Sequence, residues 1–227
     1  MLLADMSKMR GISAIELRDL FVSLVALVVA FSVLFGGSVL DINMILISTL
    51  GVASGFLLHE LAHKFTAQHL GYLAEYRANL MGLGLAVVSA FAGLLIAAPG
   101  AVMISRSRHP AQGGIPGHLT GSPLPDPFQQ EETASQLKRE MLLISLAGPL
   151  TNILLAAAFF ILGMSGLAGS AFWAQTVTIA LYINLILAAF NMLPFGPLDG
   201  KKVFDADRRV WALVGLPAIL IALPIYF

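Results

Sequence analysis

Five long segments without a charged side chain set the first constraint on what this chain can fold into. They cover residues 20–35, 42–58, 78–104, 141–198 and 210–227. A helix needs about 20 mainly apolar residues to cross the hydrocarbon layer of a bilayer. The chain is 58% hydrophobic and 11% charged, with a mean hydropathy of +0.85, which is unusual for a soluble domain of this size. The sequence therefore predicts an all-α polytopic membrane protein.

The lengths of these segments predict about five transmembrane helices. Segment 141–198 is long enough for two helices, and glycine and serine residues mark a turn between them. We expect the helices near residues 18–36, 43–70, 141–163, 174–194 and 209–227. The chain then divides into an N-terminal segment with the first helix (1–41), a membrane-embedded core (42–205) and a C-terminal helix (206–227). Ser13 and Glu16 form a capping-box pattern that would open the first helix.

The second charge-free segment leads directly into His59-Glu60-Leu61-Ala62-His63. Ionisable groups are costly inside a membrane and point to function there. On a helix, residues i and i+4 lie on one face, about 6 Å apart along the axis, so both imidazoles can bind one metal ion. Glu60 points to a neighbouring face, where it can act as a base on a metal-bound water. The motif predicts a zinc site with hydrolytic chemistry.

Lys and Arg residues predict how the chain is oriented in the membrane. None of the 13 lies in the loops 36–42 and 164–173, and short cytoplasmic loops carry an excess of these residues. We therefore expect a multi-pass protein of the cell membrane, with the N-terminus and the histidine motif toward the cytoplasmic side.

Segment 78–104 has basic residues at both ends, Arg77 and Arg106, so it should begin and end on the cytoplasmic side. A re-entrant hairpin fits this better than a sixth span, and one 20-residue helix is the alternative. Residues 105–140 are rich in Gly and Pro and predict a flexible cytoplasmic loop. This loop is either a linker or a lid over the substrate.

Zinc needs a third protein ligand, with the fourth position left to water. Because the chain contains no Cys, that ligand must be another histidine or a carboxylate. Asp199 follows the fourth predicted span, and Pro194 and Pro197 break the helix before it, which could turn Asp199 back toward the histidines. We predict one Zn²⁺ per chain at His59, His63 and Asp199; the alternative is that Asp199 is an ordinary loop residue.

Three motifs together resemble the site-2 protease family of intramembrane zinc metalloproteases. In chain order they are His59-Glu-x-x-His63, Gly148-Pro149-x-x-Asn152, and Asn191-x-x-Pro194 followed by Leu198-Asp199-Gly200. The resemblance covers about residues 45–205 and implies a catalytic core of three helices. On its own, Gly148 predicts close helix approach, and Asn152 is interpreted as a packing residue, with a place in the site as the alternative.

The family resemblance also implies roles for single residues. His59, His63 and Asp199 would hold zinc, Glu60 would be the catalytic base, and Asn191 would bind the substrate or polarise its carbonyl. The expected substrate is a transmembrane segment of another protein in the lipid bilayer. The sequence indicates no nucleic-acid partner and leaves the oligomeric state open.

Two other classes of protein compete with this interpretation. A membrane protease of the prenyl-processing type would need a glutamate ligand on a later helix, and no glutamate follows Glu140. A transporter or metal-binding scaffold could use a His/Asp cluster to carry protons or zinc. Only the protease needs a base at Glu60.

Overall fold

The structure, a computed structural model, describes residues 11–36, 41–106, 127–167 and 169–226. Five of its helical segments are long and apolar enough to cross a membrane, and they agree with the five predicted spans. These segments are Ala14–Gly36, Ile42–His69, Ala134–Met164, Ala171–Asn191 and Arg208–Ile225. The chain is a multi-pass, predominantly α-helical membrane protein.

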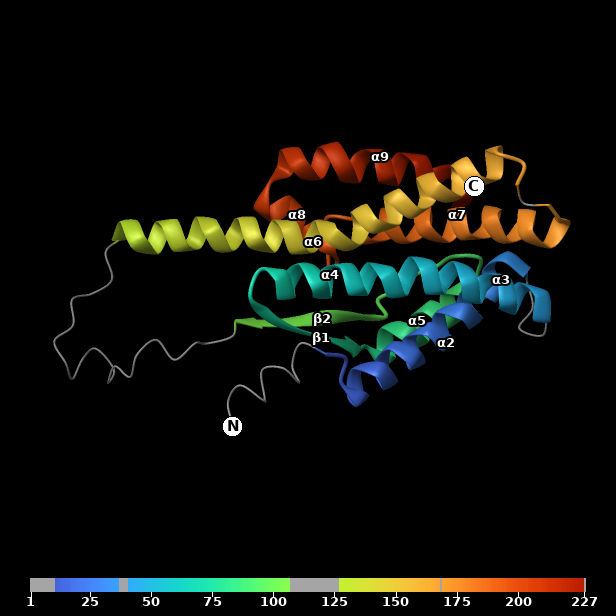
Figure 1. The fold of residues 1–227 in the computed structure, drawn as a ribbon, viewed down its shortest axis with the longest axis horizontal. Coiled ribbons are helices and arrows are strands. Elements are labelled where there is room, and N and C mark those ends of the chain that lie inside the picture. The colour runs from blue at the N-terminus through green and yellow to red at the C-terminus, as the bar shows by residue number, and fades with distance from the viewer. Residues whose placement is uncertain (1–10, 37–40, 107–126, 168, 227) are drawn as a thin grey trace.

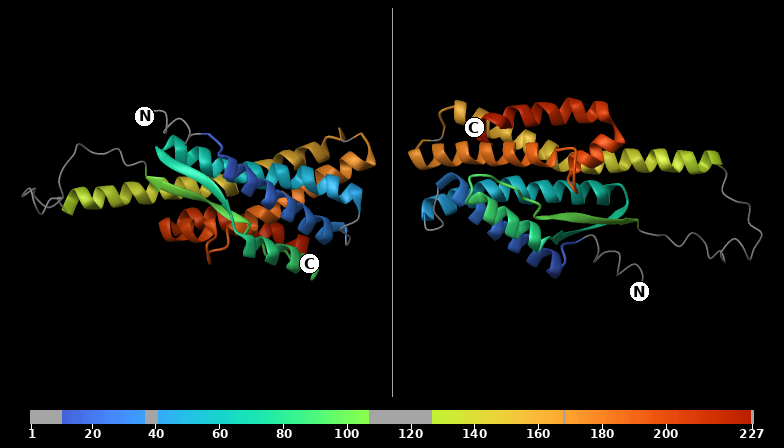
Figure 2. Two further views of the ribbon diagram at one scale, coloured as in Figure 1. Left: turned by 90° about the horizontal axis from the view of Figure 1, so that it is seen from below. Right: turned by 180° about the vertical axis from the view of Figure 1, so that it is seen from behind.

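The elements follow one another in a simple order (Figure 1). They are α2 (Ala14–Gly36), α3 (Ile42–Val52), the π-helical turn η1 (Ala53–Leu57), α4 (Leu58–His69), β1 (Tyr72–Ala78), α5 (Leu80–Ala90), β2 (Gly100–Arg106), α6 (Pro127–Met164), α7 (Ala171–Asn191), α8 (Asp199–Ala206) and α9 (Arg208–Tyr226). Helix α4 lies at the centre, with α6 and α7 on one side and the β1–β2 sheet with α2 on the other, as Figure 1 and the rear view in Figure 2 both show.

Local sequence explains where several of these helices start. Asp41 accepts hydrogen bonds from the backbone N–H groups of Asn43 (2.9 Å) and Met44 (3.2 Å) and so caps α3. Ser170 caps α7 through the N–H of Trp173. Large apolar side chains such as Leu154, which is 70% exposed, cover the outside of the bundle, where a bilayer would solvate them.

Two glycines let the segment before the motif pack tightly against α7. A Cβ atom on Gly51 would lie 2.5 Å from the side chain of Ile183, and one on Gly55 would lie 2.9 Å from Leu187. These two glycines therefore allow the segment before the motif to approach α7 closely, as small residues do between membrane helices. Gly55 also belongs to η1, and π-helical turns of this kind are frequent at functional sites.

Residues 78–104 form short elements instead of one long helix. Helix α5 has 11 residues, too few to cross a membrane, and an extended segment leads from it into β2. Strands β1 and β2 pair antiparallel, with Tyr76 opposite Val102. The alternative of one 20-residue helix is wrong, because the strand pairing and the turn after α5 interrupt it. The placement of this segment as a re-entrant hairpin in the bilayer stays a prediction.

The predicted loop 105–140 is shorter than expected. Ser105 and Arg106 are the last residues of β2, and α6 begins at Pro127. Proline is favoured in the first turn of a helix, and the residues up to Glu140 include Gln, Glu, Leu, Lys and Arg, all good helix formers. The remainder of that predicted loop, residues 107–126, lies outside the described residues.

Candidate metal centre

Three buried side chains from two distant parts of the chain meet at one point. His59 Nε2 lies 3.0 Å from His63 Nε2, and Asp199 Oδ2 lies 2.9 Å from the Nε2 of His63 and 3.5 Å from that of His59. One ligand atom from each residue falls within 4.8 Å of the others. The structure therefore brings together the three residues that the sequence predicts as ligands.

Two features of the backbone bring the two histidines and Asp199 together. His59 and His63 lie one turn apart on α4, so their rings face the same direction. Helix α7 ends at Asn191, the chain runs without helix through the two prolines, and α8 then begins at Asp199. Gly200 is required at this reversal because a Cβ there would lie 2.3 Å from the carbonyl carbon of Met192.

The surroundings of Asp199 favour the ionised form of its carboxyl group. Burial alone would raise the pKa of its carboxyl, but His63, His59 and the ammonium group of Lys202 outweigh burial and hold the pKa well below its ordinary value. Lys202 donates to Oδ1 of Asp199 at 2.9 Å, which leaves Oδ2 directed toward the histidines. A charged carboxylate is the form that binds a metal ion.

Helix α6 supplies the second layer of contacts around the histidines. Nδ1 of His63 lies 2.6 Å from the carbonyl oxygen of Ile144, and Nδ1 of His59 lies 3.2 Å from the side-chain amide of Asn152. Ile144, Gly148 and Asn152 follow one another at intervals of four residues and therefore share one face of α6. Histidine ligands of metals are normally oriented in this way through the nitrogen that does not bind the metal.

The side-chain amide of Asn152 can adopt two orientations, which differ by exchange of its oxygen and nitrogen. In one, its NH₂ group reaches the carbonyl oxygens of Gly55 and Gly148, each at 3.2 Å. In the other, its oxygen can accept the Nδ1 proton of His59 but lies 3.2 Å from the same two carbonyl oxygens, which offer it no donor. A metal on Nε2 requires that proton on Nδ1, so metal binding favours the second orientation.

The site fits a zinc ion. Two imidazole nitrogens and one carboxylate oxygen are zinc ligands of the type found in catalytic sites with an open fourth position. Gly148 keeps the necessary space, because a Cβ there would lie 2.3 Å from Nε2 of His63 and 2.6 Å from Nε2 of His59. Any larger residue would compete with the metal for the same volume.

The ligand cluster opens on a cavity of about 450 Å³. Glu60, 7% exposed, and Asn191 line this cavity together with the histidines, and strand β2 forms part of its wall. The side-chain NH₂ of Asn191 donates to the carbonyl of Leu187 at 3.0 Å, which uses one of its two hydrogens. Both residues that the sequence predicts as catalytic are thus placed where a substrate can reach them.

Gly148 and Lys202 have roles at the site that the sequence did not predict, and Asn152 takes the alternative that the sequence left open, a place in the site. Gly148 is not only a point of close helix approach but keeps the space beside both imidazoles, and Asn152 contacts His59 instead of serving packing alone. Lys202 holds the carboxylate of Asp199. The four-residue spacing of Ile144, Gly148 and Asn152 is the signal that could have indicated a shared face toward the motif helix.

Comparison with known proteins agrees with this geometry. The chain matches the profile of Peptidase family M50 over residues 47–169. It is 36% identical over 206 residues to the Methanocaldococcus jannaschii protein named "Putative zinc metalloprotease MJ0611", covering 90% of this chain and 91% of that protein. It is also 41% identical over 71 residues to "Putative zinc metalloprotease YwhC" of Bacillus subtilis, covering 28% of this chain and 32% of that one. No solved structure matches it significantly.

The chain belongs to Peptidase family M50, the site-2 protease family. It is a zinc metalloprotease with several membrane-spanning helices.

Proposed function

We propose that this zinc metalloprotease cleaves peptide bonds within or near transmembrane segments of other membrane proteins. The main support for this proposal is the position of the cavity beside a membrane-length helix. His59, Glu60, His63 and Asp199 line it, and the first three of these belong to a helix long and apolar enough to span a membrane. On the distribution of Lys and Arg, we place the N-terminus and this cavity toward the cytoplasmic side of the cell membrane.

Zinc held by His59, His63 and Asp199 would supply an activated water and an electrophile for the scissile carbonyl. Glu60 then takes one proton from the attacking water, whose oxygen bonds to the carbonyl carbon. As the C–N bond breaks, Glu60 returns the proton to the leaving nitrogen. The second N–H of Asn191 can donate to the carbonyl oxygen as negative charge develops there.

Strand β2 offers the substrate a place to bind in extended form. The N–H groups of Tyr76 and Ala78 in β1 point away from β2, so by the antiparallel pattern those of Val102 and Gly100, opposite them, point away from β1. In the part of the chain that the structure describes, the sheet has two strands, so these N–H groups have no partner strand, and residues of β2 line the cavity.

A transmembrane helix hides its carbonyls in hydrogen bonds and must unwind before water can attack one of them. An unwound segment that adds to the edge of β2 recovers backbone hydrogen bonds and lies beside Glu60. Strand β2 would thus hold the substrate in extended form during cleavage.

The first test compares the wild type with Glu60→Gln. A synthetic single-span peptide with glycines at its centre, mixed with the enzyme in detergent micelles, serves as substrate. Glu60→Gln keeps the volume and the zinc but removes the base, so we expect a normal zinc content and a loss of cleavage. A transporter or scaffold needs no base at this position, and equal cleavage by both proteins would refute the catalytic role of Glu60.

A second test addresses substrate binding at β2. Val102→Pro removes an N–H that faces the cavity and leaves the hydrogen bonds between β1 and β2 in place. We expect kcat/KM to fall by about tenfold or more, since hydrogen bonds of the substrate strand are lost, while zinc is retained. Val102→Thr, which keeps the N–H and the branched shape, is the control. Equal rates for all three proteins would remove β2 from the mechanism.

A further inference from the structure

The face of α4 that is turned toward α2 and the sheet carries a buried ion pair that the proposed reaction does not use. Lys64 follows directly after His63, and its Nζ lies 2.5 Å from Oε2 of Glu16 on α2 and 3.0 Å from the carbonyl oxygen of Gly11. The side chains of Lys64 and Glu16 are only 2% and 1% exposed. A buried ion pair usually contributes little net stability compared with apolar residues of similar volume, so its geometry is the more informative feature.

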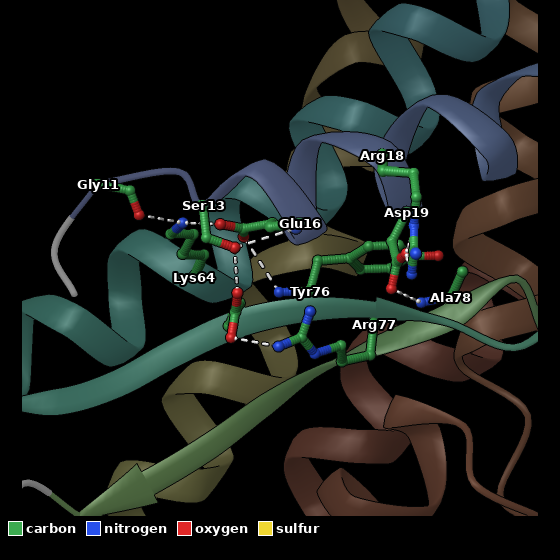
Figure 3. Close-up of polar contacts among 10 residues, drawn as sticks. Gly11, Ser13, Glu16, Arg18, Asp19, Lys64, Tyr76, Arg77 and Ala78 are labelled. Atoms are coloured by element: carbon green, nitrogen blue, oxygen red, sulfur yellow. Dashed lines mark hydrogen bonds and ion pairs between the residues drawn. The ribbon is translucent and has the colours of Figure 1, made fainter. Parts of the chain in front are cut away.

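Glu16 divides its two carboxylate oxygens between two elements (Figure 3). Oε2 binds Lys64 on α4, and Oε1 accepts the backbone N–H of Tyr76 in β1 at 3.1 Å. A single carboxylate on α2 therefore links the motif helix to the sheet. Ser13 holds Glu16 from the other side, since its Oγ accepts the N–H of Glu16 at 3.1 Å and donates to Glu75 of the same strand.

A second carboxylate, one turn further along α2, repeats this contact. Oδ2 of Asp19 accepts the N–H of Ala78 at 3.2 Å. The N–H groups of Tyr76 and Ala78 on the outer edge of β1 are thus both occupied by side chains of α2. An incoming strand can pair only with the other edge of the sheet, at β2.

Tyr76 extends the linkage to the start of β2. Its hydroxyl donates to the carbonyl oxygen of Pro99 at 2.9 Å and lies 2.9 Å from Oγ of Ser23 on α2. Gly100 follows in close contact, because a Cβ there would lie 2.4 Å from the hydroxyl of Tyr76. A continuous path of hydrogen bonds and the ion pair therefore connects Lys64, next to the zinc-binding motif, with the first residues of β2.

We propose that Glu16 and Lys64 form a positioning pair that fixes the sheet relative to the motif helix and so determines which peptide bond of the substrate faces Glu60. This inference rests on the proposed function, in which β2 binds the substrate strand. It gives α2, which precedes the residues 47–169 matched to the family, a role in cleavage beyond that of a membrane anchor.

The decisive variants are Glu16→Asp and the double variant Glu16→Gln, Lys64→Gln. Aspartate is one methylene shorter and cannot reach Lys64 and Tyr76 together, whereas the double variant removes both charges and keeps an acceptor for the N–H of Tyr76. The single-span peptide described above is the substrate, and the measurements are kcat, KM, the cleaved bond by mass spectrometry, and zinc per chain.

For both variants we expect a kcat about tenfold lower, with cleavage spread to neighbouring bonds, because small misplacements of reacting groups are costly. KM should stay within about twofold and zinc at the wild-type level, since neither the β2 edge nor the ligands change. The control is the double variant Lys201→Gln, Asp205→Asn, which removes an exposed ion pair on α8. It should leave kcat, KM, the cleaved bond and the zinc content unchanged.

A second measurement does not depend on activity. Because the chain has no Cys, spin labels can be attached specifically to Phe65→Cys on α4 and Met103→Cys on β2, both exposed positions. The distance distribution between the labels should be narrow with the wild-type pair and broader in the Glu16→Asp background. An unchanged distribution, an unchanged cleavage site and kcat, or a parallel loss of zinc would overturn the proposal. If the wild type cleaves no membrane peptide, the proposed function is refuted instead. The distances between the spin labels then still test whether Glu16 and Lys64 fix the sheet relative to the motif helix.

Discussion

Helix α4 is held differently on the side of α6 and on the side of the sheet. Toward α6, its histidines meet a glycine, a backbone carbonyl and a side-chain amide, all uncharged. Toward α2 and the sheet, Lys64 meets the carboxylate of Glu16, and the hydroxyl of Tyr76 is fully buried nearby. On the zinc side, helix α6 contributes small neutral groups to the histidines, whereas the sheet side holds a buried ion pair.

The difference reflects what each side must do. The zinc side has to leave space for an ion and to accept the Nδ1 protons of the two imidazoles, which fixes the orientation of both rings. The sheet side has to keep two elements at a fixed distance, and a buried ion pair with further hydrogen bonds does this in a defined geometry. Substitutions on the two sides should therefore have different consequences.

The largest effect is expected from Gly148→Ala on the zinc side. The new methyl group would lie 2.3 Å from Nε2 of His63, so the site cannot hold both the methyl and the metal. Zinc content, measured by mass spectrometry on purified protein, should fall nearly to zero and cleavage with it. Gly163→Ala in the same helix is the control, because the nearest atom there is 3.7 Å away. Normal zinc in Gly148→Ala would show that the metal lies elsewhere.

A smaller effect is expected from Asn152→Ala. The substitution removes the partner of His59 Nδ1 but leaves the ligands in place. Loss of such a partner typically lowers metal affinity by about 10- to 100-fold, which competition with a chelator can measure. The matched control is Thr151→Ala, since the hydroxyl of Thr151 donates to the carbonyl of Ala147 in its own helix. Equal affinities would return Asn152 to a packing role.

On the sheet side, Tyr76→Phe should affect stability more than zinc. Burial raises the pKa of Tyr76, so its hydroxyl stays protonated and donates to Pro99. Removal of the hydroxyl takes one hydrogen bond from that carbonyl, which also accepts the N–H of Asn79 at 2.8 Å, and should lower the free energy of unfolding by about 0.5–1.5 kcal/mol. Zinc affinity should stay at the wild-type value. A loss of zinc as large as in Asn152→Ala would mean that the two sides of α4 are not separate.

Much of this architecture could be predicted from the sequence. Charge-free segments predict all five spans, because a bilayer demands long apolar helices. The position of His59 and His63 one turn apart predicts their common direction, and the two prolines before Asp199 predict the break that brings this residue back to the site.

The parts that could not be predicted depend on contacts between distant residues. The apolar segment 78–104 has no clear periodicity, and its strand forms only because β1 lies alongside. Ser13 and Glu16 have the spacing of a capping box, and Ser13 does accept the N–H of Glu16. The carboxylate of Glu16, however, turns away to Lys64 and Tyr76, a choice that only the packed structure determines.

The most direct test of the central claim is the zinc content of the wild type and of Asp199→Ala, purified in detergent. The account predicts about one zinc per chain in the wild type, with two histidines and one aspartate as ligands, and a strongly reduced content in the variant. Asp199→Asn, which keeps the side-chain size, should also bind zinc more weakly because it lacks the charge. Zinc that is unaffected by both substitutions would contradict the assignment of Asp199 and with it the proposed site.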